Sequence, residues 1–260
     1  LGNDFLVAFH PGVDDLPALA RRLCDRRRGI GADGLLVAET ADGYAARMAL
    51  YNADGSLSAA CGNATRCIAR HLMDETGATA LRLRTERGVL ACEDAGGGLT
   101  RVNMGPPRLA PADIPFVAEA QAASYVIDAG GRDWTIGAVS MGNPHAVLVV
   151  DDVASAPVES LGPVLEQHPR FPRRVNVGFM AVRDRSHIDL RVYERGAGET
   201  LACGTGACAA VVAGRLQGLL DERVTVRLPG GELVISWPAN DQPVWMTGPA
   251  TRVFEGSIGI

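Results

Sequence analysis

The feature that most constrains this chain is an internal repeat with a period of about half its 260 residues. Two segments align without a gap, because Tyr51 and Tyr193 each lie ten residues before a cysteine, Cys61 or Cys203, and a glycine follows each cysteine. Three further pairs of segments match: residues 34–38 with 176–180, Gly2-Asn3 with Gly142-Asn143, and residues 104–106 with 246–249. Solenoid repeats are about 20 to 50 residues long, so this period predicts a duplicated lobe.

Hydrophobic alternation and turn residues predict the same order of elements in both halves. In the first half we expect helices over residues 14–25 and 61–75, and strands over residues 4–9, 35–39, 45–51, 81–85, 88–93 and 100–104. In the second half we expect helices over residues 158–167 and from Cys203 to about residue 219, and strands over residues 125–128, 133–139, 146–150, 176–183, 187–193, 224–228, 232–237 and 244–247.

These elements predict an α+β fold of two lobes related by a pseudo-two-fold axis. Each lobe is expected to wrap a mixed or antiparallel sheet around a central helix, with the active site in the cleft between the lobes. Four prolines between residues 105 and 115 indicate the boundary. The predicted lobes are therefore residues 1–110 and 111–249, with residues 250–260 returning to the first lobe.

Cys203 lies in a glycine-rich turn that is followed at once by an apolar run. This pattern predicts a strand-to-helix turn with Cys203 near the helix N-terminus. The positive end of a helix dipole and its unpaired N–H groups favour a thiolate. A single cysteine in such a turn is more often a buried structural residue, but Cys61 repeats the arrangement.

The composition excludes several classes of protein. All 25 basic residues are arginine, so neither the Schiff-base lysine of a pyridoxal phosphate enzyme nor the lysine of a Walker A loop is present. A net charge of −5 argues against a nucleic-acid surface. The clusters at residues 26–28 and 173–174 are better explained as solvated faces or carboxylate contacts. With no run of 18 apolar residues and no signal peptide, we expect a cytoplasmic protein that does not span a membrane.

We expect the six cysteines to be reduced thiols, not disulfides or zinc ligands. A chain of this length needs no disulfides to stabilise it, and no secretion signal accompanies the cysteines. The spacings of Cys61 with Cys67 and of Cys203 with Cys208 are wider than those of a zinc knuckle, so no metal is expected. We interpret Cys67 and Cys208 as core residues, and Cys24 and Cys92 as structural.

If Cys61 and Cys203 face one carbon, one thiolate takes a proton while the opposing thiol supplies another to the other face. Backbone N–H groups at the two helix starts can hold a carboxylate and the charge that develops on it. The pattern therefore predicts a racemase or epimerase of α-amino acids that needs neither a metal nor pyridoxal phosphate.

Five motifs together resemble those of the diaminopimelate epimerase family. They are Asn3 in G-N-D-F, Cys61 in C-G-N-A-T-R-C, Asn143 in M-G-N-P-H, Asn176 in V-N-V-G, and Cys203 in E-R-G-A-G-E-T-L-A-C-G-T-G-A. The resemblance spans essentially the whole chain. It implies interconversion of LL- and meso-2,6-diaminopimelate in lysine and peptidoglycan precursor synthesis, by a homodimer without a cofactor.

The resemblance also implies roles for particular residues. Cys61 and Cys203 would be the acid/base pair, tuned by His145 and Glu194. The carboxylate at the reacting centre would be bound by Gly62, Asn63, Gly204 and Thr205. Other substrate contacts would come from Asn3, Asn52, Asn143, Asn176, Glu194 and Arg195. Many members of the family carry Gln where this chain has Gly34, so one side-chain contact is expected to be lost or replaced.

Alternative readings remain open at this point. A proline racemase or hydroxyproline epimerase also uses paired cysteines on this scaffold, and a non-catalytic binding protein or thiol redox switch would use the same residues differently. His145, Asn52 and Asn176 are also typical of turns, and Glu194-Arg195 of a surface ion pair.

Overall fold

The computed structural model describes residues 1–58, 61–86, 88–238 and 241–259, and the chain divides into two compact units. The N-unit comprises Asn3–Asn103 and Thr247–Ile260, and the C-unit comprises Leu1–Gly2 and Met104–Met246. Residues 104–110 therefore belong to the C-unit and residues 247–249 to the N-unit, which differs from the boundaries expected from the prolines. At the first of these boundaries the reason is backbone pairing, because the N–H of Met104 donates to the carbonyl of Val244 at 2.8 Å. At the second, Nε of Arg66 in the N-unit donates to the carbonyl of Pro249 at 3.3 Å.

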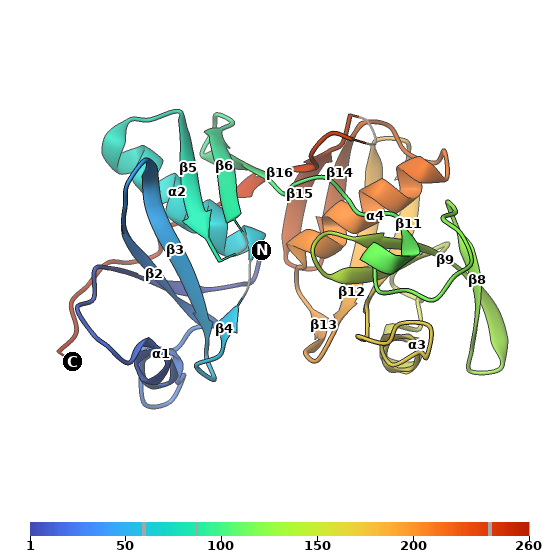
Figure 1. The fold of residues 1–260 in the computed structure, drawn as a ribbon, viewed down its shortest axis with the longest axis horizontal. Helices are drawn as coiled ribbons and strands as arrows, with labels where there is room; N and C mark the ends of the chain where they lie inside the picture. Colours follow the sequence, from blue (N-terminus) through green and yellow to red (C-terminus); the bar gives the residue numbers. More distant parts are fainter. Residues whose placement is uncertain (59–60, 87, 239–240, 260) are drawn as a thin grey trace. The chain divides into compact units, whose positions relative to one another are not determined.

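In its described residues, the N-unit contains a mixed sheet and the helices α1 and α2 (Figure 1). Its strand order is β1-β2-β3-β5-β6-β7, with β4 paired to β3, and only the β1–β2 and β3–β5 pairs among these strands are parallel. The strands are β1 (Phe5–Phe9), β2 (Gly34–Ala41), β3 (Tyr44–Asn52), β4 (Leu57–Ser58), β5 (Ala80–Thr85), β6 (Gly88–Asp94) and β7 (Leu99–Asn103). The helices are α1 (Leu16–Cys24) and α2 (Gly62–Thr76).

The C-unit repeats this plan and adds a hairpin (Figure 1). Its strand order is β16-β15-β14-β12-β11-β10-β9-β8, with β13 paired to β12. The strands are β8 (Tyr125–Ala129), β9 (Arg132–Ser140), β10 (Pro144–Val149), β11 (Asn176–Asp184), β12 (His187–Glu194), β13 (Gly198–Thr200), β14 (Arg223–Leu228), β15 (Gly231–Ser236) and β16 (Trp245–Pro249). The last three residues of β16, 247–249, belong to the N-unit. The helices are α3 (Val158–Glu166), α4 (Gly204–Leu216) and the short 3₁₀ helix η1 (Pro111–Asp113).

The two units share not only strand order but also strand register. In the N-unit, Tyr51 of β3 pairs with Leu35 of β2 and with Leu57 of β4. In the C-unit, the matching Tyr193 of β12 pairs with Val177 and with Glu199. In both units the strand order includes two parallel pairs at corresponding places. The repeat seen in the sequence is therefore a repeat of topology, and the β8–β9 hairpin is an addition to it.

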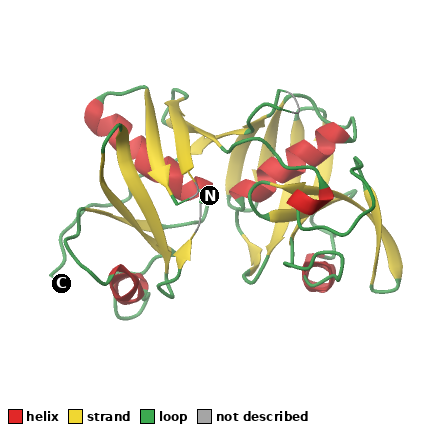
Figure 2. Cartoon of the chain, in the orientation of Figure 1, coloured by secondary structure: helices red, strands yellow, loops and turns green. Residues whose placement is uncertain are grey.

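Helix α4 forms the centre of the C-unit core. Its residues from Ala207 to Gly214 are all buried, as expected for a helix that is apolar on every side. It contacts strands β9, β10, β11, β12 and β15, and Figure 2 shows it lying across them. Helix α3 packs on an apolar cluster that shares the same strands, because alternate residues of β10 and β11 point to opposite faces.

Every helix and strand expected from the sequence is present, and the α+β class is confirmed. Strands β4 and β13 and the helix η1 were not predicted, because they are too short to show a periodic pattern. Helix α4 ends at Leu216, before the predicted end near residue 219, because Gly218, with a φ of 74°, turns the chain.

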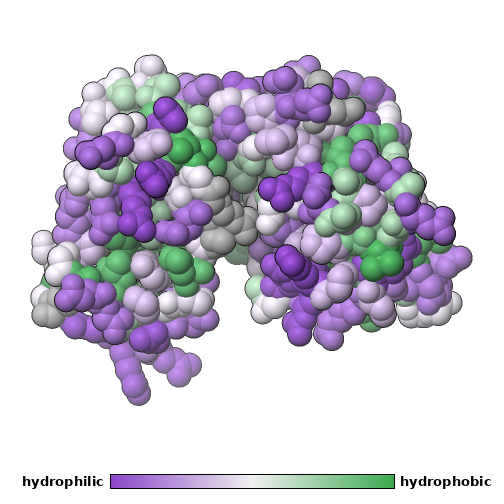
Figure 3. All heavy atoms as spheres, in the orientation of Figure 1, coloured by the Kyte–Doolittle hydropathy of each residue, from purple (hydrophilic) through white to green (hydrophobic). Residues whose placement is uncertain are grey.

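The surface is consistent with this burial of apolar residues. On the face drawn in Figure 3, hydrophilic residues predominate and hydrophobic residues lie in small separate patches. Within the described ranges, no helix combines the length and the apolar character that crossing a membrane requires.

Candidate active site

Cys61 and Cys203 are the N-cap residues of α2 and α4, so the prediction that each cysteine opens a helix is confirmed. Both have extended backbones, with φ and ψ of −140° and 112° at Cys61 and −118° and 107° at Cys203. The first N–H groups of a helix have no carbonyl partner within the helix. The starts of α2 and α4 can therefore each bind an anion such as a carboxylate.

The thiol of Cys203 is buried, with the residue only 4% exposed. Its Sγ lies 3.6 Å from Oγ1 of Thr205. A Cβ added at Gly206 would approach this sulfur to 3.2 Å, which explains the second glycine of the C-G-T-G motif. Glycine here leaves room for the thiol at the helix start.

Burial raises the pKa of Cys203 well above its usual range, and the nearby carboxylate of Glu194 raises it further. The hydroxyl of Thr205 and the N–H of Gly206 lower the pKa of this thiol, but by less. The direction is opposite to the one expected from the helix N-terminus alone. The surroundings of Cys203 therefore favour its protonated thiol.

His145 is connected to this thiol through two polar side chains. Its Nε2 lies 3.1 Å from Oδ1 of Asn143, whose Nδ2 donates to Oγ1 of Thr205 at 3.4 Å. Since an amide oxygen only accepts, the Nε2 atom of His145 carries the hydrogen. Burial, followed by the charge of Arg195, lowers the pKa of His145 to about 3. His145 is therefore neutral and acts as a donor toward Asn143.

The turn that carries Glu194 and Arg195 is held by polar side chains. Asn176, which is buried, accepts a hydrogen bond from the N–H of Arg195 at 3.0 Å and donates to the carbonyl of Pro144 at 2.9 Å. Oε1 of Glu166, also buried, accepts from the N–H of Gly196 at 2.9 Å. These contacts fix the backbone of the turn on both sides of Arg195.

The side chains of the turn itself point to separate partners. Oγ1 of Thr200 donates to Oε1 of Glu194 at 2.5 Å, which orients the carboxylate that influences Cys203. The guanidinium of Arg195 is exposed and donates through Nη1 to the carbonyl of Arg173 at 2.8 Å. Because a guanidinium has five N–H donors, Arg195 retains donors for a carboxylate.

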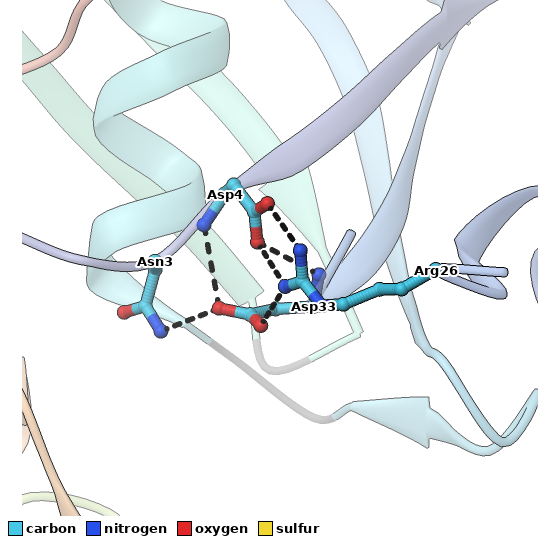
Figure 4. Close-up of polar contacts among 4 residues, drawn as sticks. All are labelled: Asn3, Asp4, Arg26 and Asp33. Carbon is cyan, nitrogen blue, oxygen red and sulfur yellow. Dashed lines mark hydrogen bonds and ion pairs between the residues drawn. The ribbon is translucent and has the colours of Figure 1, made fainter. Parts of the chain in front are cut away.

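In the N-unit, a chain of amides leads from α2 to a charged cluster. Figure 4 shows the part of it that joins Asn3 to Asp33, Arg26 and Asp4. Nδ2 of Asn63 donates to Oδ1 of Asn3 at 2.6 Å, and Nδ2 of Asn3 donates to Oδ2 of Asp33 at 3.0 Å. Arg26 then bridges Asp33 and Asp4, at 2.8 Å and 2.7 Å. This ion pairing holds the pKa of Asp4 below its usual range. Arg26 thus makes carboxylate contacts, one of the two interpretations offered for its cluster.

The structure groups the expected residues by unit. In the C-unit it brings together Cys203, Thr205, Asn143, His145 and Glu194, while the side chain of Asn176 holds the adjoining turn that carries Arg195. In the N-unit, Asn3 and Asn63 are joined at the start of α2, which follows Cys61. Asn52 is placed differently, at the end of β3, where its Nδ2 donates to Oγ of Ser56 at 2.9 Å.

Three residues that support the site, Asp33, Glu166 and Thr200, were not predicted from the sequence. Asp33 and Glu166 each contact a residue 30 positions away, so no local pattern marks them, whereas Thr200 contacts Glu194 within the same motif. The only signal was the run of motif residues beside Asp33 and Thr200 in G-I-G-A-D-G and E-R-G-A-G-E-T. As to metals, no group of three His, Cys, Asp or Glu side chains suited to an ion occurs in the part of the chain that the structure describes.

Comparison with solved structures identifies the fold. The chain superposes on a phenazine biosynthesis protein of the PhzF family from Bacillus anthracis with a TM-score of 0.69 and 14% identity, covering all of this chain and 94% of that one. It superposes on a probable proline racemase from Agrobacterium radiobacter with a TM-score of 0.63 and 18% identity, covering 90% and 78% of the two chains. At these identities the likeness concerns the fold alone.

Sequence comparison identifies the family. The family model described as diaminopimelate epimerase matches residues 1–110 and 137–253. A diaminopimelate epimerase of Thioalkalivibrio sulfidiphilus is 55% identical over all of this chain and 96% of that protein. One from Halorhodospira halophila is 54% identical over 99% of this chain and 92% of its own length. The chain therefore belongs to the diaminopimelate epimerase family of isomerases.

Proposed function

We propose that this enzyme interconverts LL- and meso-2,6-diaminopimelate without a cofactor, with Cys61 and Cys203 as its acid/base pair. The observation that carries the proposal is that both cysteines are N-caps of corresponding helices in two copies of one topology. Two matching helix starts, each with one thiol, suit a reaction in which a proton leaves one face of a carbon and another arrives at the opposite face.

In one direction, the Cys61 thiolate takes the α-proton while the Cys203 thiol gives a proton to the opposite face. The C–H bond that breaks and the one that forms leave the substrate with inverted configuration, and the reverse reaction exchanges the two roles. The raised pKa of Cys203 supports its holding a proton when substrate binds. This step requires both thiols to reach one α-carbon when substrate is bound.

Charge that develops during proton removal spreads onto the α-carboxylate. We assign its binding to the helix starts, through Gly62 and Asn63 in the N-unit and Gly204 and Thr205 in the C-unit. N–H donors that are already oriented stabilise such charge without reorganisation. Cys61 and Cys203 stand directly before these donors in the chain.

The remaining residues are assigned to the substrate's other groups. Arg195 is the proposed partner of the distal carboxylate, because its exposed guanidinium suits bidentate binding. The further proposed contacts are Asn3, Asn52, Asn143, Asn176 and Glu194. Asn176 has at most one amide hydrogen left for substrate, since its other polar atoms hold Pro144 and Arg195. His145 and Glu194 are proposed to tune Cys203.

The biological setting is part of the same proposal. We place the reaction in lysine and peptidoglycan precursor synthesis, in the cytoplasm, with the enzyme acting as a homodimer. The names of the relatives support the reaction, while location and assembly rest on the sequence alone. Size-exclusion chromatography with light scattering tests the dimer.

Solvent exchange tests the reaction itself. In D2O we expect deuterium at the α-carbon of LL-diaminopimelate, detected by mass spectrometry, and none in L-proline or trans-4-hydroxy-L-proline. Exchange into proline without exchange into diaminopimelate would favour a proline racemase, whose fold this chain shares. Exchange into none of the three would favour a binding protein or a thiol redox switch.

A further inference from the structure

Asp33 is a charged residue to which the proposed reaction assigns no role. It lies directly before β2, with its side chain 38% exposed. Its carboxylate accepts hydrogen bonds from Nδ2 of Asn3 at 3.0 Å, from the N–H of Asp4 at 3.3 Å and from Nη2 of Arg26 at 2.8 Å. The guanidinium of Arg26, the side chain of Asn3 and the backbone N–H of Asp4 thus hold this carboxylate in one place (Figure 4).

An ionised carboxylate only accepts hydrogen bonds, whereas a carboxamide has one donating and one accepting end. Asn3 must therefore turn its Nδ2 toward Asp33 and its Oδ1 toward Asn63. Asn63 must in turn present its Nδ2 to Asn3, as observed at 2.6 Å. If the Asn3 amide were flipped, oxygen would face oxygen at Asp33 and NH2 would face NH2 at Asn63.

The consequence falls on the first turn of α2. Asn63 is 5% exposed, and its Oδ1 is a buried acceptor with no hydrogen-bond partner among the described residues. With the amide oriented by Asn3, an acceptor rather than a second donor stands at this helix start. If the Asn63 amide were flipped, its Nδ2 donor would take the place of this Oδ1 acceptor, beside the N–H groups that follow Cys61.

We infer that Asp33 is a positioning residue, which acts through Asn3 to fix the carboxamide orientation of Asn63. The inference rests on the proposed function, because that function places the first turn of α2 at the substrate carboxylate. Asp33 itself touches neither α2 nor substrate in this scheme. Its negative charge makes the residue an obligatory acceptor toward Asn3, and the ion pair with Arg26 holds the carboxylate in place.

The test is Asp33→Asn, which replaces the obligatory acceptor by an amide that can face Asn3 with either end. Asp4→Asn is the matched control: it removes the same charge beside the same Arg26, but the Asp4 side chain does not contact the Asn3 amide. We expect Asp33→Asn to lower kcat/KM for LL-diaminopimelate about tenfold, within the range of couplings between contacting residues. Asp4→Asn should leave kcat/KM within about twofold of the parent enzyme, because it keeps the Asp33 carboxylate as the acceptor for Nδ2 of Asn3.

A double-mutant cycle separates positioning from a structural effect. In an Asn3→Ala background the link is missing, so adding Asp33→Asn should not lower kcat/KM further. An equal loss in both backgrounds, or equal losses for Asp33→Asn and Asp4→Asn, would overturn the inference. If Asp33→Asn fails to fold, as judged by thermal unfolding, Asp33→Ser makes the same test, since a hydroxyl also both donates and accepts.

A readout independent of turnover keeps this inference distinct from the proposed function. In protein labelled with ¹⁵N-asparagine, the side-chain NH2 signals of Asn63 should shift or broaden in Asp33→Asn and stay in place in Asp4→Asn. Unchanged Asn63 signals in Asp33→Asn would refute the relay. A parent enzyme that does not exchange diaminopimelate would refute the proposed function, while the NMR result would still decide the relay.

Discussion

Asn176 accepts a hydrogen bond from the N–H of Arg195 at 3.0 Å and, through the same amide, donates to the carbonyl of Pro144 at 2.9 Å. Pro144 begins β10, Asn176 begins β11 and Arg195 follows β12, so one side chain joins the ends of three strands. Asn143 and His145 flank Pro144. The amide therefore couples the turn that carries Arg195 to the polar chain that ends at Cys203.

Asn176→Asp should separate these two contacts. An aspartate can still accept from Arg195 but cannot donate to Pro144, and two acceptors then face each other in a buried place. We expect the free energy of unfolding in urea at pH 7 to fall by about 1–3 kcal/mol, with a rise in KM. Gln167→Glu, the same change at an exposed position next to α3, should be nearly neutral. Equal stabilities of both variants would contradict the role of Asn176.

Two substitutions beside Cys203 should move its titration in opposite directions. The hydroxyl of Thr205 lowers the pKa of this thiol and the carboxylate of Glu194 raises it. Thr205→Val should therefore shift the appearance of thiolate to higher pH, and Glu194→Gln should shift it to lower pH. The measurement is absorbance at 240 nm against pH, as the difference from the same protein carrying Cys203→Ser. Shifts in the same direction would show that one of the two groups does not act as described, namely Glu194 if both shifts are upward and Thr205 if both are downward.

His145 should make the protein less stable in mild acid. Its folded pKa of about 3 lies below the ordinary value of 6.5, so below pH 6.5 the unfolded chain binds a proton that the folded chain does not. Stability is therefore lost as pH falls from about 6.5, at about 1.4 kcal/mol per pH unit.

Urea unfolding at pH 7 and pH 5 checks this dependence. Between those values the parent protein should lose about 2 kcal/mol that a His145→Gln variant does not lose. His10→Gln, at an exposed position, should keep the parental pH dependence. The same slope in His145→Gln as in the parent would rule out a buried neutral His145.

Either cysteine-to-serine change at the helix starts should stop proton exchange. A serine hydroxyl is too weak an acid and base to replace the thiol, so Cys61→Ser and Cys203→Ser should each lower α-deuterium exchange by about 10²- to 10⁴-fold. Cys67→Ser, within α2, is the control and should retain exchange. Full exchange in either N-cap variant would exclude that cysteine from the acid/base pair.

Glu166 should matter for binding although it lies outside the turn. Its buried carboxylate accepts from the N–H of Gly196, so Glu166→Ala leaves this N–H without its partner and loosens the turn that holds Arg195. We expect KM for diaminopimelate to rise and the free energy of unfolding to fall by about 1–3 kcal/mol. Glu159→Ala, on the exposed side of the same helix α3, is the comparison, and a parental KM in Glu166→Ala would argue against the contact.

The sequence by itself determined the duplicated plan, the order of elements and the placing of Cys61 and Cys203 at helix starts. These properties are local or repeated: alternation predicts a strand, a glycine-rich turn before an apolar run predicts a helix start, and two matched copies reinforce each other. The motifs around Cys203 also carried the family assignment. Short strands such as β4 could not be predicted, because two residues are too few to show an alternating pattern.

Only the tertiary structure decided how the site residues are partnered. The contacts of Asp33 with Asn3 and of Glu166 with Gly196 join residues that are 30 positions apart, and no local pattern encodes such pairs. The pKa of Cys203 went against the expectation from its helix for the same reason. A helix start favours the thiolate, but burial by the surrounding strands and the charge of Glu194 outweigh it. Both of those depend on how distant segments pack.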